Sequence, residues 1–418
     1  MGADINSLPH EVLVRIFQFY LELESQVKFF NYVSNVCRTW KGVSRNRCFF
    51  ETLDGSLPLS ALVTLAKAGS LRLTKTLKFG KVTKDKSGHY KCIYSNMPRL
   101  KHIDLTNVCE KLYHRKEHPV FTELDGLCPE LCELVLSPPD AHCKSKILGV
   151  VFEKMMKIRG PHFVHLDFSS VNIYGLPNIF ELVADNCPKI EELLAQNMKG
   201  NILLLRFNTG NMQKKCPKLK TLRLGFPITF VRNAYKDPVG FPDLEIFTHP
   251  IRDAYFFRSS DLETLLCRSP KLKILDVRGC VPMSFEVLNS LPATDLEQIN
   301  LSWLNDLNYT GIIKIFQKWS HSLNIVDVSH IKDKAVNEMF SPQHLPNGLP
   351  NLEVLNVNNT SITVETLKVI IQQNPKLRYL NLESCHGLIR GTRQIHRSRS
   401  EIEKLLVKIE KFEEMDCI

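Results

Sequence analysis

A short pattern of apolar and polar positions recurs through most of the chain. From residue 97 onward, x-L-x-x-L-x-L appears eleven times, often after a proline, with first apolar positions 24 to 32 residues apart. The last two apolar positions alternate with polar ones, as a strand that buries one face requires. The eleven copies begin at Leu100, Leu131, Phe163, Ile190, Leu219, Leu244, Leu272, Leu296, Leu323, Leu352 and Leu377.

Segments between the copies change to helical spacing. Leu367, Ile370 and Ile371 form the clearest of these segments, and Thr363 precedes them as a capping residue. One strand and one helix cannot bury their own apolar face, so each unit needs its neighbours. We therefore predict an α/β leucine-rich-repeat solenoid over residues 97–390, with a curved parallel sheet inside and helices outside.

Two segments depart from this rule. Residues 225–241 have Pro and Gly where a helix would lie, which predicts an irregular outer face for that unit. Residues 199–213 are also poor in turn-to-helix signals, and we expect a loop across the repeats at one of the two segments. Cys280 and Cys385 each follow the last repeat position by three residues, where a small buried side chain fits a tight turn.

The ends of a solenoid expose apolar faces and need covers. Residues 51–96 are expected to form a linker and N-terminal cap, and residues 391–418 a basic stretch followed by a C-terminal capping helix. Ser398 and Glu401 have capping-box spacing ahead of that helix. A coiled-coil role for the helix stays open. Its apolar stripe consists of Ile402, Leu405, Leu406, Ile409 and Phe412.

Residues 1–50 predict a small helical module. Ser7 is a candidate cap for a first helix, with Pro9 and Glu11 in its first turn. A module of this size without disulfides has a thin core, so a partner that covers its surface is expected. The apolar positions of the first helix are Leu8, Val12, Ile16 and Phe19, broadened by Leu13 and Phe17, and those of the second stretch are Val27, Phe30, Val33, Val36 and Trp40.

The motif LPxEVLxxIF followed by VCRxW resembles the F-box. Two departures are a longer segment between the halves and Glu24, Ser25, Gln26 and Val27 in place of the usual Asp-Leu step. The resemblance implies docking on the Skp adaptor of SCF-type cullin–RING ubiquitin ligases, with Trp40 inside the module. The matches are Leu8, Pro9, Glu11, Val12, Leu13, Ile16, Phe17, Val36, Cys37, Arg38 and Trp40. The implied adaptor-binding residues are Leu8, Pro9, Glu11, Val12, Ile16 and Phe17.

The repeats, with their Cys-type turns, resemble the cysteine-containing leucine-rich repeats of F-box proteins. The resemblance implies a receptor that holds a protein substrate for ubiquitination and proteasomal degradation, with cullin and RING subunits as further partners. Polar positions beside the second and third apolar residues are expected to face the concave side. The candidate substrate-binding residues are Ile274, Asp276, Asn300, Ile325, Asp327, Val354, Asn356, Tyr379 and Asn381.

This set forms an apolar strip flanked by hydrogen-bonding side chains, and its two carboxylates favour a basic partner. Asp and Asn at such positions also serve solubility alone, and that interpretation stays open. If the set binds substrate, replacing Asp276, Asp327 and Tyr379 together should abolish substrate capture while adaptor binding persists.

Composition narrows the alternatives. Hydrophobic residues make up 44% and charged residues 23%, without an apolar run that predicts a membrane span or a signal peptide. Thirteen scattered cysteines without a CxxC pair indicate reduced thiols, so we expect the cytoplasm or nucleus, no zinc site and no cofactor. The net charge of +10 is concentrated between residues 72 and 91 and between 390 and 399. Because aromatic residues are few there, a solvated charge run is favoured over nucleic-acid binding.

An enzyme is disfavoured, since no GxSxG, P-loop, HExxH or GxGxxG pattern is present. In the family, the RING and E2 partners transfer the ubiquitin. The remaining alternative is a leucine-rich-repeat scaffold or nucleic-acid-associated protein without a ligase role. A steep salt dependence of nucleic-acid affinity would point to that alternative.

Overall fold

The chain forms two compact units, Met1–Gly200 and Asn201–Ile418. The expectations for Ser7, Lys81, Lys84, Lys86 and Arg390, and for the side chain of Phe412, lie outside the described residues. The computed structural model describes residues 8–80, 88–106, 123–124, 126–136, 146–174, 178–198, 205–231, 238–251, 257–280, 283–304, 309–331, 335–389 and 391–416.

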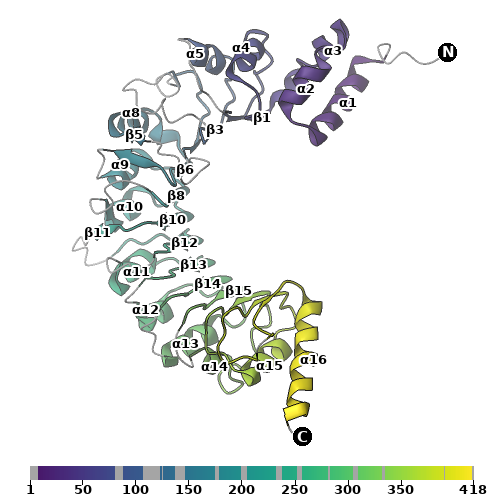
Figure 1. Cartoon of the computed structure of the whole chain (residues 1–418). Coiled ribbons are helices and arrows are strands. Elements are labelled where there is room, and N and C mark those ends of the chain that lie inside the picture. The colour runs from purple at the N-terminus through teal and green to yellow at the C-terminus, as the bar shows by residue number, and fades with distance from the viewer. Residues whose placement is uncertain are drawn as a thin grey trace, which may run out of the picture. The chain divides into compact units, whose positions relative to one another are not determined.

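A helical module opens the first unit (Figure 1). Leu13 and Phe17 of its first helix are buried, together with Phe29 and Phe49. The Phe17 and Phe29 rings meet edge to face with centroids 5.8 Å apart, so aromatic side chains make most of this small core. The module comprises α1 (His10–Leu23), α2 (Gln26–Val33), α3 (Arg38–Val43) and the 3-10 helix η2 (Arg47–Phe50).

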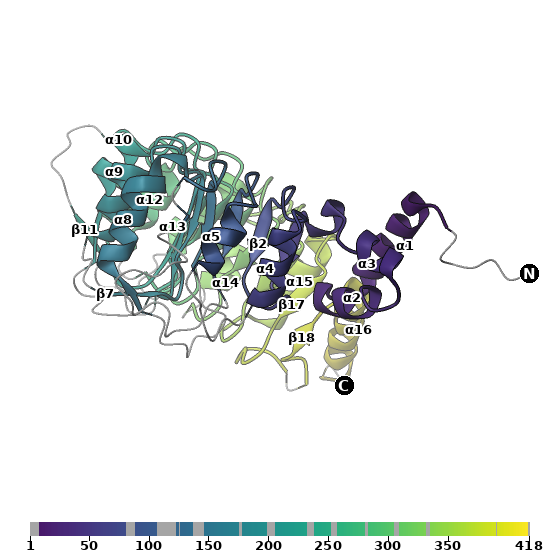
Figure 2. The same cartoon turned by 90° about the horizontal axis from the view of Figure 1, so that it is seen from above.

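Parallel strands follow in the first unit, each pairing in register with the next. Their order is β1 (Thr52–Asp54), β2 (Thr76–Lys78), β3 (His102–Asp104), β4 (Glu133–Val135), β6 (His165–Asp167) and β8 (Glu192–Gln196). The strand connections contain helices, and α4 and α5 lie beside β2 in Figure 2. These connections hold α4 (Leu59–Lys67), α5 (His89–Tyr94), α8 (Gly149–Arg159), η3 (Gly160–His162), α9 (Ile179–Asn186) and a side pair, β5 (Lys146–Leu148) with β7 (Asn172–Tyr174).

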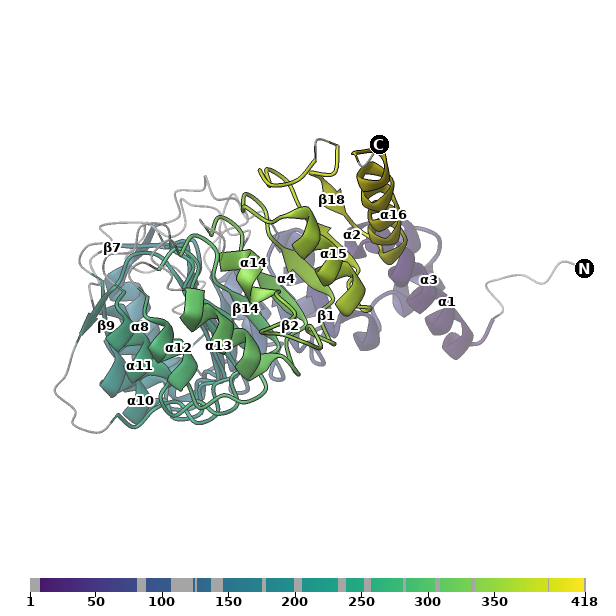
Figure 3. The ribbon, with the colours of Figure 1, turned by 90° about the horizontal axis from the view of Figure 1, so that it is seen from below.

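The second unit repeats this arrangement. Its parallel strands are β10 (Thr221–Gly225), β12 (Ile246–Thr248), β13 (Ile274–Asp276), β14 (Gln298–Asn300), β15 (Ile325–Asp327), β16 (Val354–Asn356) and β17 (Tyr379–Asn381). A short strand, β18 (Ile395–His396), ends the series antiparallel to β17. Figure 3 shows α12 to α15 in a row along one side of these strands. The remaining elements are β9 (Arg206–Asn208), α10 (Thr209–Lys215), β11 (Thr229–Val231), α11 (Ser259–Leu266), α12 (Phe285–Ser290), α13 (Tyr309–Trp319), α14 (Ala335–Met339), α15 (Val364–Gln373) and α16 (Arg399–Asp416).

The predicted fold class is confirmed, because each of the eleven sequence copies leads into one of these parallel strands. Two further strands, β1 and β2, precede them within residues 51–96. Their central residues Leu53 and Leu77 are buried like those of the predicted copies. Thr74 stands where a copy has leucine, and its hydroxyl is satisfied by donating to the Phe50 carbonyl at 2.6 Å. A polar residue therefore hid one repeat from the sequence pattern.

The turns after the strands are closed by side chains. The third strand residue is often Asp or Asn, and its Oδ1 accepts the backbone N–H two residues later, as Asp167 does from Ser169 at 2.8 Å. Cys280 and Cys385 are fully buried in such turns, as predicted, and burial raises the pKa of both thiols. Cys280 donates to the His249 carbonyl at 3.1 Å, so the thiol is a turn component.

The outer layer is irregular where the sequence predicts it. The described residues between β10 and β12 contain the short strand β11 and no helix. The second segment that lacked helix signals does contain the start of a helix, α10, which Asn208 caps by accepting the Asn211 N–H at 3.1 Å.

The helix α16 covers the far end of the second unit, beside α15 and β18 (Figure 3). Its residues Ile402, Leu405 and Ile409 are buried. Arg399 at its start donates to the Asn374 carbonyl at 3.0 Å, which joins α16 to the end of α15. None of the described helices has the length and apolar content to cross a membrane.

Candidate functional site

An apolar stripe on α1 is turned to solvent. Val12, Ile16, Phe19 and Leu23 are 40%, 39%, 66% and 83% exposed. Their spacings of four, three and four residues put them on one side of the helix. Six of the nine exposed large apolar side chains in the described residues lie between residues 12 and 36. A surface this apolar on a small module is typical of a protein interface.

The structure divides the predicted adaptor-binding residues into two groups. Pro9, Glu11, Val12 and Ile16 are exposed, and Leu8 is half-buried at the start of the helix. Their predicted contacts with an adaptor stay a prediction.

Phe17 faces the interior and is only 1% exposed. Its ring packs against that of Trp40, which sequence analysis placed inside the module, with centroids 5.0 Å apart. Phe17 follows buried Leu13 by one helical turn, which is why it faces the core. Its role is therefore to hold the module together, which corrects its assignment as a contact residue.

Phe19 and Leu23 extend the exposed stripe beyond the predicted adaptor-binding residues. Both lie beyond the LPxEVLxxIF motif, and Phe19 was grouped with the apolar positions of the helix without a choice of face. The helical spacing of the two residues could have identified them. Phe19 and Leu23 follow Val12 by seven and eleven residues, and residues at these spacings lie on the same side of a helix. The longest apolar contact surface of α1 therefore runs from Val12 to Leu23.

Gln26 fastens the module to the first repeat. Its side-chain amide donates to the carbonyls of Phe49 and Thr52 at 3.2 and 2.6 Å. Its Oε1 accepts the Asp54 backbone N–H at 3.1 Å. Because Gln26 belongs to α2 and residues 52–54 form β1, these bonds fix the helices directly against the repeat strands. Gln26 stands where the usual Asp-Leu step of the motif is missing.

Comparison with known families agrees with this module. Residues 5–54 match the family model described as F-box-like. The chain therefore joins an F-box-like module to a leucine-rich-repeat fold. The F-box comprises α1 to α3 and η2, and the match ends with β1, the strand that Gln26 holds.

Searches for whole-chain relatives add no closer identification. No curated protein matches in sequence. Among solved structures, the chain resembles that of the Rad7 and Elc1 complex in yeast at 15% identity, covering 93% of this chain and 89% of that one, with a TM-score of 0.49.

Two further likenesses are to bacterial proteins. A leucine-rich-repeat protein of Leptospira interrogans has 13% identity, with 91% of this chain and 93% of that one covered and a TM-score of 0.44. An internalin of Listeria monocytogenes has 11% identity, with coverages of 78% and 88% and a TM-score of 0.40. At these values the likenesses do not bear on partners or substrate.

The strand face turned away from the buried core, called the open face here, carries the predicted substrate residues of the second unit. The register aligns their first strand positions in a column, Ile274, Gln298, Ile325, Val354 and Tyr379, and all five are half-buried. The third positions form a second column, Asp276, Asn300, Asp327, Asn356 and Asn381. A column that is apolar except for Gln298, called the apolar column, therefore runs beside a polar one.

The polar column is occupied by contacts within the protein. Asp276 is buried and forms an ion pair with Arg278 at 2.6 Å, which raises the pKa of the guanidinium. Asp327 Oδ2 accepts from the amides of Asn300 and Asn356 at 3.4 and 3.0 Å. The Asp276 carboxylate is thus paired with a cation, whereas Asp327 is held by neutral amides, and the binding of a basic partner by these two residues stays a prediction.

At the end of the apolar column, the half-buried Tyr379 is approached by a side chain of the same protein. The Arg397 guanidinium lies 6.0 Å from the centre of the Tyr379 ring, at the outer range of a cation–π contact. The open face of the first unit differs, because its first column alternates imidazole and carboxylate from β3 to β8. His102 contacts Glu133 at 2.9 Å and His165 contacts Glu192 at 2.8 Å.

Three turn residues of the second unit form a stack that the sequence did not indicate. Trp303, His330 and Asn359 all have positive φ, which is uncommon for residues other than glycine. The rings of Trp303 and His330 lie 3.8 Å apart and nearly parallel, and the Asn359 amide is 2.9 Å from His330 Nδ1. The backbone conformation of the turns places these three side chains together, and the pattern of apolar residues contains no information about that conformation.

No group of His, Cys, Asp and Glu in the described ranges could hold a metal ion.

Proposed function

We propose that this protein is the substrate-recognition subunit of an SCF-type E3 ubiquitin ligase. The observation that carries the proposal is the solvent-facing stripe of Val12, Ile16, Phe19 and Leu23 within the segment that matches the F-box-like model. Buried aromatic and aliphatic anchors dominate the energetics of interfaces of this kind. The stripe would dock on the Skp adaptor, which connects to the cullin and RING subunits.

The repeats would hold the substrate. Ile274, Ile325 and Val354 of the apolar column are half-buried and can gain burial against a protein edge. The chain would act as a receptor without chemistry of its own, while the RING and E2 partners transfer ubiquitin and the proteasome degrades the product.

The adaptor contact is tested by co-purification with recombinant Skp adaptor. Ile16→Asp places a carboxylate in the stripe and should weaken adaptor binding by at least about tenfold, as loss of an interface anchor does. Ile158→Asp is the matched control, because Ile158 is an isoleucine on a helix of the same unit and is 37% exposed against 39% for Ile16. Equal binding by both variants would remove the proposal.

The alternative of a scaffold without a ligase role predicts a different result. A scaffold would retain protein partners but would not co-purify with adaptor and cullin. Proximity labelling under proteasome inhibition, with and without Ile16→Asp, would separate the two functions. Under the proposal, labelled substrates persist in both samples and become ubiquitinated only with the unsubstituted chain.

A further inference from the structure

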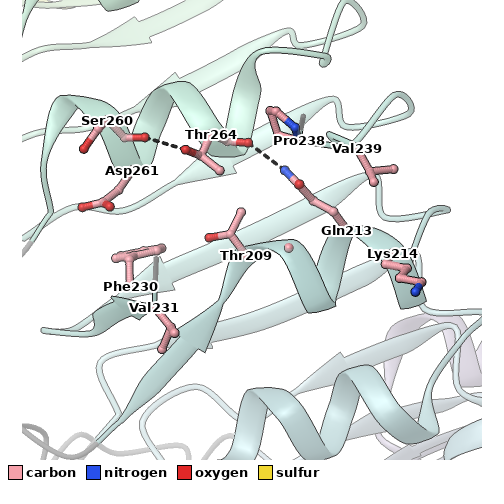
Figure 4. Close-up of a pocket in the computed structure, with 11 residues that line it drawn as sticks. Thr209, Gln213, Lys214, Phe230, Val231, Pro238, Val239, Ser260, Asp261 and Thr264 are labelled. Carbon is pink, nitrogen blue, oxygen red and sulfur yellow. Dashed lines mark hydrogen bonds between the residues drawn. The ribbon is translucent and has the colours of Figure 1, made fainter. Parts of the chain in front are cut away.

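The missing helix between β10 and β12 leaves a gap in the outer layer of the second unit. Later helices pack on one another in sequence, α11 on α12, α12 on α13 and α13 on α14, whereas α10 and α11 share no comparable contact. A cavity of about 190 Å³ remains there, between α10, β11 and α11 (Figure 4).

The cavity has an apolar wall. Phe230 and Val231 of β11 line it together with Pro238 and Val239. Val239 is 51% exposed, so the apolar wall reaches the surface. A small molecule can therefore enter without the core being opened.

One buried acceptor in the cavity has no partner. Gln213 of α10 is completely buried, and its Nε2 donates to the Thr264 carbonyl of α11 at 2.8 Å (Figure 4). That bond fixes the orientation of the amide, because only the nitrogen can donate. Gln213 Oε1 has no hydrogen-bond partner, and a buried acceptor left in this state destabilises the protein.

Two other polar groups of the lining are already engaged. The Thr264 hydroxyl donates to the Ser260 carbonyl at 2.7 Å. The buried carboxylate of Asp261 accepts the Arg258 backbone N–H at 2.9 Å. Gln213 Oε1 is therefore the buried lining acceptor that a hydrogen-bond donor on a ligand can satisfy.

We propose that this cavity binds a small neutral molecule with a compact apolar body and one O–H or N–H group. The body contacts Phe230, Val231 and Val239, and the donor bonds to Gln213 Oε1. A volume of about 190 Å³ limits the ligand to the size of a substituted benzene ring. The site is separate from the F-box and does not depend on the proposed ligase function.

The proposal is tested on the full chain with two fluorinated probes of nearly the same shape. 4-Fluorophenol carries an O–H donor, and 4-fluorotoluene has a methyl group in its place. Titration followed by fluorine NMR should show saturable binding of the phenol and about tenfold weaker binding of the toluene, as expected when a buried acceptor stays unpaired. Equal affinities, or no saturation by either probe, would overturn the proposal.

Two substitutions locate the site. Gln213→Met removes the acceptor and should make the two probes bind alike, with the fold checked by circular dichroism. Val239→Asp should weaken both probes without unfolding, since the side chain is already half exposed. Val407→Asp on α16 is the matched control, because Val407 is also 51% exposed. Binding that is unchanged by Val239→Asp, or reduced equally by Val407→Asp, would place the probes elsewhere and refute the assignment.

Discussion

His249, one residue beyond β12, should make the stability of the second unit depend on pH. The side chain is fully buried among phenylalanines, with ring centroids 4.8 Å from Phe257 and 5.6 Å from Phe230. Neither ring nitrogen has a hydrogen-bond partner. Burial without a partner disfavours the charged imidazolium and lowers the pKa of His249 from 6.5 to about 3.

The sign and size of the effect follow from this pKa. Below pH 6.5 His249 becomes protonated in the unfolded chain. In the folded chain it stays neutral until the pH falls to about 3. The unfolding free energy is therefore not reduced by His249 above pH 6.5, and it decreases as the pH is lowered below that value. The loss reaches about 2 kcal/mol at pH 5 and approaches about 5 kcal/mol near pH 3, at 1.36 kcal/mol per pH unit.

Urea unfolding at pH 8 and pH 5 measures this loss, with tryptophan fluorescence as the probe because Trp303 and Trp319 belong to the second unit. His249→Phe keeps an aromatic ring in the same surroundings and cannot titrate. The difference in unfolding free energy between this variant and the unsubstituted chain should grow by about 2 kcal/mol from pH 8 to pH 5. A difference that stays constant over this range would refute a buried neutral imidazole.

Two more predictions concern hydrogen bonds that fix the repeats. Gln26→Leu removes three side-chain hydrogen bonds and should lower the unfolding free energy by about 2–4 kcal/mol. Hydrogen exchange of the Asp54 backbone amide should become faster. Gln18→Leu is the control, because Gln18 is exposed on α1, and it should leave that exchange unchanged. Asp327→Ala removes the acceptor of the Ser329 N–H and of two asparagine amides and should lower the stability of the second unit by about 2–3 kcal/mol in thermal unfolding. A loss below about 0.5 kcal/mol would mean that the polar column is free for partners after all.

The repeats were predictable because the same pattern of buried apolar positions occurs many times along the chain. Each copy places leucine or a similar residue at a position that must be buried, and eleven copies outweigh an irregular one such as Phe163, Leu166 and Phe168. The strand β2 was not counted among the repeats because Thr74 takes a leucine position. Its polarity is balanced by one hydrogen bond to the Phe50 carbonyl, and such a bond is a tertiary contact that a local pattern does not contain.

The candidate binding surfaces were less predictable, since exposure depends on what packs against a residue. In α1 the sequence presents apolar residues on two sides, and only the packing of Phe29 and Trp40 shows that Phe17 lies inside. In the polar column, the sequence places Asp276 and Asp327 correctly on the sheet. It does not show that Arg278 and two asparagines neutralise or bond them.

The Gln26 contacts have a mechanical consequence. The module and the first repeat meet without a spacer, because α2 is bonded directly to the strand that starts the repeats. An adaptor bound to α1 would keep a fixed orientation relative to the first strands for as long as these hydrogen bonds hold. If ubiquitin must be brought to several lysines of a substrate, the required movement would have to occur elsewhere in the assembly.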